Sequence, residues 1–416
     1  MPSVEGLAAR RAALQMLDAV FRRGQTLDAA AAHVRNLSPP DRALAVAIAG
    51  EALRRTPDLD ALIDSATRQP LPDDSKPRMV LRLALAQKIG LGTPDHALVA
   101  TALPLVDGGP RRLVHGVLGT LLRRGIALPG APRLPADVEE RWRDAWGDEP
   151  VDAARRQIAN RPPLDLTFVE ESEAQAYAEE QGGVSLAPRH VRVESSAVTE
   201  LPGYGTGRWW VQDLAASLPA RLIPNEARDV LDLCAAPGGK TMQLSAAGHA
   251  VTAVDASQSR LKRLRENLER TRLQAELVQA DALEWQAKRS FDAILLDAPC
   301  SATGTFRRHP EVLYRARPQI IAGNADLQRQ LIDRAATWLK PGGSLVYSVC
   351  SLERQEGEDS IAAFLCSHPD FAIARPTDLP SFVGVSGRGW VRILPGILEA
   401  EGGLDGFFMA RLVRTR

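Results

Sequence analysis

The segment RDVLDLCAAPGGKTMQLSAAGHAVTAVD, residues 228–255, contains the pattern that decides the fold of this chain. Two short apolar runs, 228–234 and 249–255, flank a Gly-Gly turn and a helix-like stretch. Strands whose two faces are both covered by helices appear in a sequence as nearly continuous apolar runs. The segment therefore predicts a strand, a turn at Gly238 and Gly239, a helix and a second strand.

The same alternation continues toward the C-terminus. Further apolar runs at 275–281, 291–299 and 343–350 alternate with helix-like stretches at 259–272 and 324–340. This order predicts a parallel sheet with helices on both faces, so we expect a Rossmann-like α/β domain over residues 206–416. The run GFFMARLV, residues 406–413, is expected to add a final edge strand.

Residues 1–130 show helical patterns only, which predicts an all-α bundle. Ser38 is a suitable N-cap ahead of Pro39, because proline is tolerated in the first turn of a helix. Gly90 and Gly125 each follow an apolar helical run and are expected to end it.

A proline-rich stretch at 125–137 follows the predicted bundle and is typical of a linker. Residues 138–205 then mix a helical start with short β-like runs. We expect a small α+β intermediate module there, whose role the pattern does not reveal.

Composition limits the class of protein. The 416 residues include 51 basic and 51 acidic side chains, so a histone-like polycation is excluded, although a basic face is not. Four cysteines without a CxxC pair predict free thiols in a reducing compartment and no metal site. With no apolar signal segment and no membrane-length run, we expect a soluble cytoplasmic protein without a membrane partner, and we expect it to be a monomer.

The turn at 232–244 predicts an anion site, since helix N-termini and glycine turns present free N–H groups. A P-loop would need glycine six residues before Lys240, where Cys234 stands, and the dinucleotide pattern GxGxxG is also absent. A ligand with a carboxylate in place of a phosphate chain fits better.

Acidic residues close the next strands. Asp255 follows one apolar run at the position expected for a ribose contact, and Asp281 follows the next, where it could accept from an adenine amine. An adenosine that carries a carboxylate is S-adenosylmethionine (SAM), which we therefore predict as the ligand. Each acid taken alone could equally cap the following helix.

Two cysteines, Cys300 and Cys350, end the fourth and fifth predicted strands, whose carboxyl ends should line one crevice. Two thiols beside a methyl donor indicate a substrate carbon that needs activation, such as C5 of cytosine, which becomes nucleophilic once a thiolate adds to C6. The residue pattern does not decide which thiol attacks. Cys366 is expected to be a buried packing residue, as is Cys234 within the turn.

A charged loop follows Cys300. Arg307, Arg308 and His309 are expected to lie exposed, where they could favour the thiolate and hold nucleic-acid phosphate. Asp297, three residues before Cys300, could protonate or hydrogen-bond the N3/N4 edge of a flipped cytosine, and could also contact the donor.

Three long motifs, DLCAAPGGKT (232–241), LLDAPCSATGTFRRHPEV (295–312) and SVCSLERQEGED (348–359), resemble those of the RNA cytosine-5 methyltransferase family. VQDLAASL (211–218) and DGFFMARL (405–412) extend the resemblance. The N-terminal helices are similar to the NusB-like RNA-binding domain of the bacterial Fmu/Sun branch, which methylates small-subunit (16S) ribosomal RNA. The resemblance covers nearly the whole chain and implies a ribosomal RNA substrate, not DNA.

The resemblance also implies roles for individual residues. Cys350 is the nucleophile, Cys300 assists release of the adduct, and Asp297 completes the catalytic set. One departure is Val349, which stands before Cys350 where the family usually has threonine, so fine positioning of the nucleophile is in question. The implied SAM-binding residues are Cys234, Ala235, Ala236, Pro237, Gly238, Gly239, Lys240, Asp255, Asp281 and Asp297.

Other functions remain open at the level of sequence. A cytosine-5 methyltransferase could act on transfer RNA or 23S ribosomal RNA instead. The GGKT sequence could belong to a P-loop-like nucleotide hydrolase. A helical domain with a degenerate methyltransferase half could be a non-catalytic RNA-binding factor.

Overall fold

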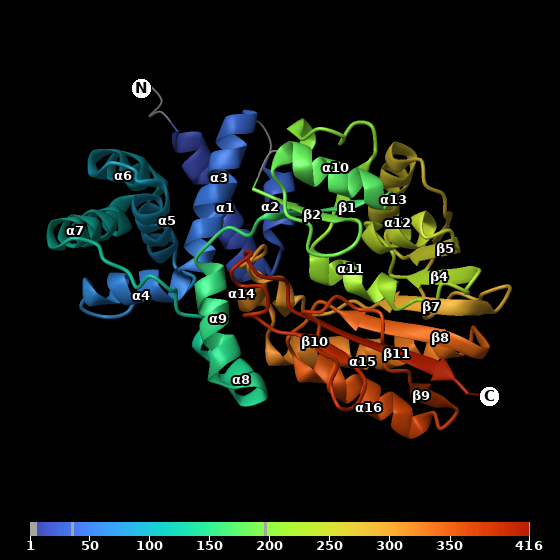
Figure 1. Cartoon of the computed structure of the whole chain (residues 1–416). Coiled ribbons are helices and arrows are strands. Elements are labelled where there is room, and N and C mark those ends of the chain that lie inside the picture. The colour runs from blue at the N-terminus through green and yellow to red at the C-terminus, as the bar shows by residue number, and fades with distance from the viewer. Residues whose placement is uncertain (1–5, 35–36, 195–197, 416) are drawn as a thin grey trace. The chain divides into compact units, whose positions relative to one another are not determined.

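A computed structural model describes residues 6–34, 37–194 and 198–415 (Figure 1). The chain forms two compact units. The helical unit comprises the chain up to Arg161 together with Phe306–Arg317, and the α/β unit comprises Pro162–Thr305 and the chain from Pro318 onward. None of the helices in this described part combines the length and apolar character that a membrane span requires.

The described part of the helical unit consists of short helices connected by turns. They are α1 (Leu7–Arg23), α2 (Leu27–His33), α3 (Pro39–Arg54), α4 (Thr56–Ser65), α5 (Lys76–Leu91), α6 (Asp95–Ala102), η1 (Leu103–Leu105), α7 (Gly108–Arg124), α8 (Ala136–Trp146), α9 (Asp148–Ile158) and α14 (Val312–Arg315).

Local signals account for most of these boundaries. The Ser38 hydroxyl accepts from the Asp41 N–H and begins α3, as predicted, and Gly125 ends α7. Gly90 does not end its helix: α5 continues through it to Leu91, and Gly92 provides the left-handed C-cap at φ 62°. A glycine inside a helix weakens it without ending it, so only the backbone reversal at Gly92 decides the end.

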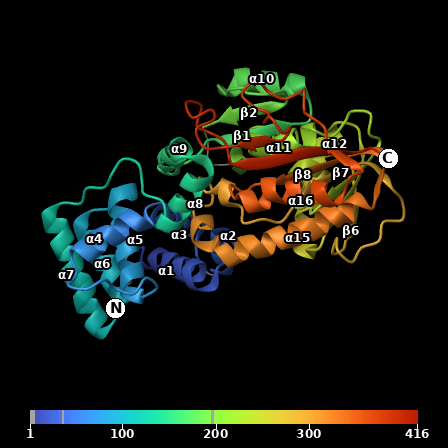
Figure 2. The same cartoon turned by 90° about the horizontal axis from the view of Figure 1, so that it is seen from below.

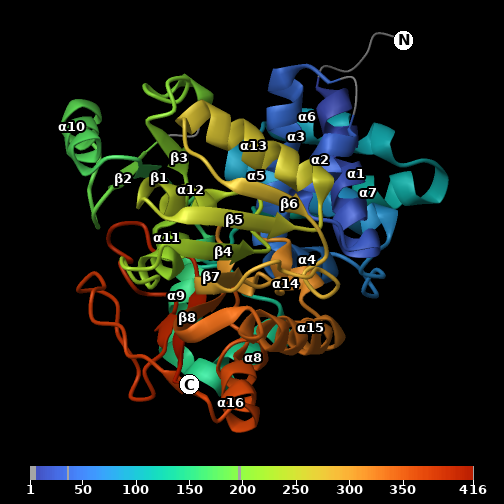
Figure 3. The same ribbon diagram turned by 90° about the vertical axis from the view of Figure 1, so that its right-hand side faces the viewer.

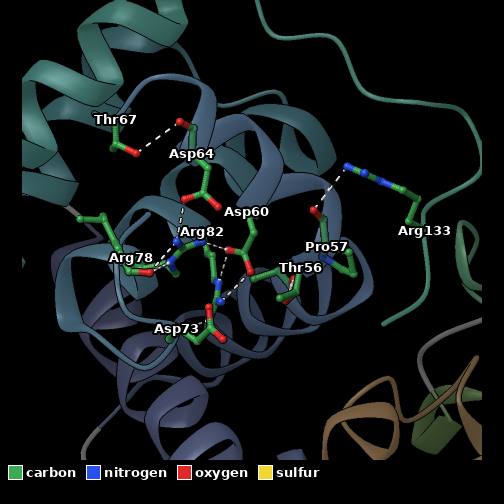
Figure 4. A network of polar contacts seen from close by, with 11 residues as sticks. Thr56, Pro57, Asp60, Asp64, Thr67, Asp73, Arg78, Arg82 and Arg133 are labelled. Atoms are coloured by element: carbon green, nitrogen blue, oxygen red, sulfur yellow. Dashed lines mark hydrogen bonds and ion pairs between the residues drawn. The ribbon is translucent and has the colours of Figure 1, made fainter. Parts of the chain in front are cut away.

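Two buried guanidinium groups connect α4 and α5 inside the helical unit (Figure 4). Arg78 and Arg82 are 1% and 2% exposed and lie one helical turn apart. Arg82 forms a bidentate pair with Asp60, both contacts at 2.7 Å, and Arg78 contacts Asp60 at 3.1 Å and Asp64 at 2.6 Å. The two aspartates on α4 and the two arginines on α5 are each four residues apart, so each pair lies on one face of its helix. Both buried guanidinium groups therefore have a carboxylate partner.

The segment Phe306–Arg317 folds with the helical unit, although it follows the strand that carries Asp297. The Tyr314 hydroxyl donates to the Leu53 carbonyl at 2.8 Å, and the Leu27 N–H donates to Glu311 Oε1 at 3.0 Å. The helical unit is therefore completed by a segment that interrupts the sequence of the α/β unit.

The α/β unit contains two sheets in its described residues. Its helices are α10 (Glu171–Gln181), η2 (Val198–Glu200), α11 (Leu214–Arg221), α12 (Gly239–Ala246), α13 (Gln258–Thr271), η3 (Thr303–Thr305), α15 (Pro318–Ala336), η4 (Arg354–Glu356) and α16 (Glu358–Ser367). Its strands are β1 (Leu164–Phe168), β2 (His190–Val193), β3 (Trp209–Val211), β4 (Asp229–Leu233), β5 (Ala250–Asp255), β6 (Glu276–Gln279), β7 (Phe291–Asp297), β8 (Leu339–Val349), β9 (Phe371–Ile373), β10 (Val391–Ile393) and β11 (Phe407–Arg414).

The smaller sheet is antiparallel, in the order β2-β1-β3. Asp165 of β1 is fully buried and accepts two hydrogen bonds from Arg192 of β2, at 2.7 and 2.9 Å. Those contacts and the neighbouring His190 hold the pKa of Asp165 well below its ordinary value despite its burial. The charge pair is therefore a fixed structural link between the strands.

The larger sheet has the order β10-β11-β8-β7-β4-β5-β6, with β9 also paired to β11. Figure 3 shows the part of this order that runs from β8 through β7, β4 and β5 to β6. Strands β4 to β8 are parallel, as predicted. The prediction of a final edge strand at 406–413 is wrong in its placement, because β11 lies between β8 and β10 and runs antiparallel to both. A short β10 supplies the edge, so the sheet is mixed.

Alternate side chains of the central strands pack on opposite faces of this sheet. On one face, residues of β4 and β7 such as Leu231 and Ile294 share a core with α15 and α16, which lie side by side in Figure 2. On the other face, Val230 and Ala293 pack with α11 and α12. Both faces are apolar because both are covered, which is why the strands appear as continuous apolar runs in the sequence.

Candidate active site

The predicted anion turn lies between β4 and α12. Gly238 caps α12 at φ 107°, and an added Cβ there would overlap a methyl carbon of Leu264, so only glycine fits. Gly239 opens the helix, whose first N–H groups lack intrahelical partners and point into the turn. The turn can therefore hold a ligand carboxylate.

The predicted acids lie at or just beyond three strand ends. Asp255 ends β5, is 4% exposed, and accepts the Ala236 N–H at 3.1 Å and the Ser257 N–H at 2.9 Å. Asp281 follows β6, is exposed, and accepts the Leu283 N–H at 2.9 Å. Each acid thus has the local backbone contact expected of a capping residue. Asp255 also binds the backbone of the predicted anion turn, at Ala236.

Asp297, at the end of β7, connects the turn to β8. Its Oδ2 lies 2.7 Å from Lys240 Nζ, and its Oδ1 accepts the Ser348 hydroxyl at 2.8 Å. Lys240 also lies over the Phe407 ring, with Nζ 5.2 Å from its centroid. Asp297 is therefore held from both sides, with about a third of its side chain left exposed.

One acid of this site was missed in the sequence. Asp232 of β4 is fully buried; one oxygen accepts the Thr241 hydroxyl at 2.6 Å, and the other has no hydrogen-bond partner in the described structure. Burial raises the pKa of Asp232 to about 7, and the nearby Asp297 and Asp255 add to the effect. An acid inside the apolar run VLDLC was the available signal.

The two cysteines meet at the carboxyl ends of β7 and β8. The sulfurs of Cys300 and Cys350 are 3.5 Å apart, although the residues are 50 positions apart in the chain. Contact with the Cys350 sulfur, together with burial, raises the pKa of Cys300 well above its ordinary value. Cys300 is therefore a protonated thiol at neutral pH and can donate to the sulfur of Cys350.

The other two cysteines behave differently. Cys234 is half-buried in the turn, where burial raises its pKa to about 12, so it is an unreactive thiol. Cys366 is exposed on α16, and the prediction that it is buried is wrong. Its neighbour Phe364 occupies the buried position on that helix.

The prediction of an exposed basic loop after Cys300 is wrong for Arg307, whereas Arg308 is partly exposed and the His309 side chain is 42% exposed. Arg307, Arg308 and His309 belong to the segment that folds with the helical unit, and Arg307 is 1% exposed. A guanidinium that is enclosed by protein is not available to hold a phosphate. Arg307 therefore has a structural role and does not contribute to an exposed basic surface.

Comparisons with known proteins agree over the whole chain. The model of the 16S rRNA methyltransferase RsmB/F family matches residues 219–413, and that of the NusB family matches residues 7–123. Ribosomal RNA small subunit methyltransferase B of Erwinia tasmaniensis is 35% identical over 97% of both chains. The protein of that name from Xanthomonas campestris is 36% identical over 99% of this chain and 98% of its own.

The chain belongs to the RsmB/F family. As an RsmB/F protein it is a SAM-dependent RNA methyltransferase. Solved structures agree with this fold. PH0851 superposes with a TM-score of 0.76 at 22% identity over 99% of both chains, and a methyltransferase homologue from Pyrococcus horikoshii with 0.56 at 26% identity over 71% of this chain and 98% of its own.

The residues present fit the cofactor of RsmB/F enzymes. SAM combines a carboxylate with a cationic sulfonium, and the site combines a helix N-terminus with carboxylates. Asp232, Asp255 and Asp297 lie close enough to affect one another's charge, with Lys240 as the cation among them. Such a set favours a positively charged centre, so the turn suits one end of SAM and the acids suit the other.

Proposed function

We propose that this protein methylates C5 of a cytosine in 16S ribosomal RNA, through a covalent adduct between Cys350 and C6 of the base. The observation that carries the proposal is the 3.5 Å separation of the Cys300 and Cys350 sulfurs beside the SAM turn. Two thiols at this separation can work on a single pyrimidine ring.

Cys350 is assigned as the nucleophile. Its thiolate adds to C6, and the ring electrons move to C5, which then forms a bond to the methyl group. Loss of the C5 proton to water and of the Cys350 thiolate from C6 restores the ring. Bound SAM supplies the methyl group as an electrophile. The resemblance of SVCSLERQEGED (348–359) to the family motif that carries the nucleophile supports this choice.

Cys300 is assigned to release of the product. Its sulfur lies 3.5 Å from the Cys350 sulfur, so the Cys300 thiol can donate a hydrogen bond to that sulfur as it leaves C6 and gains charge. Asp297, held by Lys240 and Ser348, is assigned to the N3/N4 edge of the base, where charge develops on addition to C6. Asp255 and Asp281 are assigned to the ribose and the adenine of SAM.

We also propose that the helical unit and the sheet β2-β1-β3 recruit the RNA. The match of residues 7–123 to the NusB family supports this for the helices. The names of the relatives support the small-subunit RNA as substrate, and we propose that the reaction takes place in the cytoplasm.

The thiol assignment is tested by three single substitutions in the full-length protein. Cys350→Ala is expected to lose methyl transfer by roughly four or more orders of magnitude, since it removes the nucleophile. Cys300→Ala is expected to accumulate a protein–RNA adduct that survives denaturation. Cys366→Ala, which removes an exposed thiol on α16, is the control and keeps full activity. An active Cys350→Ala protein, or normal release by Cys300→Ala, would contradict the roles.

The substrate is tested by bisulfite sequencing of RNA from a strain that lacks the gene. Loss of one protected cytosine in 16S ribosomal RNA, restored by the intact gene but not by the Cys350→Ala form, is expected. Loss of a site in 23S ribosomal RNA or transfer RNA instead would overturn the assignment of the substrate.

A further inference from the structure

A buried carboxylate that the mechanism does not use lies behind the two thiols. Glu356 ends η4, six residues after Cys350, and its side chain is fully buried. Burial raises the pKa of Glu356, although hydroxyl and backbone donors oppose the effect. Burying a carboxylate lowers the stability of the folded protein unless the carboxylate is hydrogen-bonded. The groups that bind Glu356 therefore indicate its role.

The partners of the Glu356 carboxylate include the residues directly after each of the two cysteines, together with Asn324 and Gln328 of α15. Its Oε1 accepts the backbone N–H of Ser301 at 2.8 Å, and its Oε2 accepts the hydroxyls of Ser301 and Ser351. Ser301 follows Cys300 and Ser351 follows Cys350. One carboxylate therefore binds both loops at the position next to the thiol.

Neighbouring contacts connect the same two loops. Thr303 Oγ1 accepts the Leu352 N–H at 3.0 Å, and the Gly304 N–H donates to the Cys350 carbonyl at 3.0 Å. The sheet register itself ends at the pair of Asp297 and Ser348, before either cysteine. Beyond that pair, these contacts and those of Glu356 set the distance between the loops.

We propose that Glu356 is a positioning residue, which sets the separation of the Cys300 and Cys350 sulfurs by holding Ser301 and Ser351 together. This inference rests on the proposed function, in which both thiols serve one ring. It assigns no contact with RNA or SAM to Glu356. Removing the carboxylate would let the two loops separate while the cofactor turn stays as it is.

The first test is kinetic. Glu356→Ala is expected to lower kcat by about 100-fold, which is the order of loss for a misplacement of about 1 Å, and to leave the affinity for SAM unchanged. Glu356→Gln keeps an oxygen that can accept the Ser301 N–H, so it is expected to recover part of the lost rate. A Glu356→Ala protein with wild-type kcat would overturn the proposal.

The matched control is another carboxylate that binds backbone N–H groups. Asp292, near the opposite end of β7, accepts the N–H groups of Arg228 and Asp229 at 3.0 and 2.9 Å. Asp292→Ala removes similar bonds far from the thiols and is expected to lower thermal stability without the loss of kcat. Equal loss of kcat in both variants would show a general structural effect and contradict the proposal.

The second test reads the thiols without RNA or SAM. Diamide takes two electrons from a close pair of thiols and is reduced to its hydrazine, while the sulfurs form a disulfide and give up their two protons. The protein in which only Cys300 and Cys350 remain is expected to close this disulfide at least about tenfold faster than its Glu356→Ala form. Equal rates would overturn the positioning role.

The outcomes separate the two proposals. If Cys350→Ala remains active, the proposed function fails whatever Glu356 does. If Cys350→Ala is inactive while Glu356→Ala matches the wild type in kcat and in disulfide closure, only the positioning role fails.

Discussion

Lys240 Nζ and Asp297 Oδ2 lie 2.7 Å apart, so the cofactor turn after β4 and the catalytic end of β7 are joined by one ion pair. The lysine side chain is 10% exposed and that of the aspartate 32%, which leaves part of the carboxylate open to a ligand. Asp297 is therefore held in position by the ion pair while part of its carboxylate remains exposed.

Asp297→Asn should alter the discrimination between SAM and its product. The substitution keeps the shape of the side chain and removes a negative charge from a site that receives a sulfonium cation. We expect the affinity for SAM to fall by about tenfold, or about 1.4 kcal/mol, and that for the neutral product S-adenosylhomocysteine to fall less. Titration calorimetry with both ligands measures this, with Asp292→Asn as control. An equal loss for both ligands would exclude a charge effect.

Asp232 should make the stability of the α/β unit depend on pH. Its pKa is raised by burial to about 7 in the folded protein, well above that of an exposed aspartate. The folded state therefore holds a proton that the unfolded state has already released, so stability is full at low pH and is lost as pH rises through about 7. The expected loss is roughly 1.4 kcal/mol per pH unit between pH 5.5 and 7.

Asp232→Asn should remove this dependence, because an amide does not titrate and can still accept from Thr241. Thermal unfolding of both proteins from pH 5.5 to 8 is the measurement. If the unfolding temperatures of the two proteins change in parallel over this pH range, the pH dependence does not come from Asp232.

Asp60→Ala should destabilise the helical unit strongly. It removes the carboxylate that pairs with the buried guanidinium of Arg82, while Arg78 keeps its contact with Asp64, and breaking a buried ion pair in this way costs about 3–5 kcal/mol. Chemical denaturation of the full chain checks the value. Asp73→Ala is the control, since Asp73 contacts Arg82 through its backbone carbonyl and not its side chain. A loss below about 1 kcal/mol for Asp60→Ala would show that the pair is dispensable.

Tyr314→Ala should loosen helices that lie more than 250 residues earlier in the chain. The Tyr314 ring packs edge-on against the Phe21 ring of α1, with 5.1 Å between the ring centroids, and its hydroxyl donates a hydrogen bond to the Leu53 carbonyl of α3. We expect a loss of about 2–3 kcal/mol from truncating this partly buried ring, and about 1 kcal/mol for Tyr314→Phe. Hydrogen exchange resolved by peptide should show faster exchange in α1 and α3. Unchanged exchange there would mean that the helical unit does not need the segment.

Much of this protein could be predicted from its sequence because the signals are local. Apolar runs alternating with helices predicted the parallel strands β4 to β8, and Ser38 and Gly125 predicted helix ends. The motifs around Lys240, Cys300 and Cys350 pointed to one crevice, because the carboxyl ends of neighbouring parallel strands meet at one edge of a sheet.

Only the tertiary structure decided the rest. The burial of Arg307, the exposure of Cys366 and the inner position of β11 depend on which surfaces meet, and periodicity along a chain does not contain that information. The same holds for Glu356, whose partners Ser301 and Ser351 are separated by 50 residues and meet only when β7 and β8 pair. A sequence specifies which residues are compatible with a strand, a turn or a core, whereas distances between loops arise from the packing of whole elements against one another.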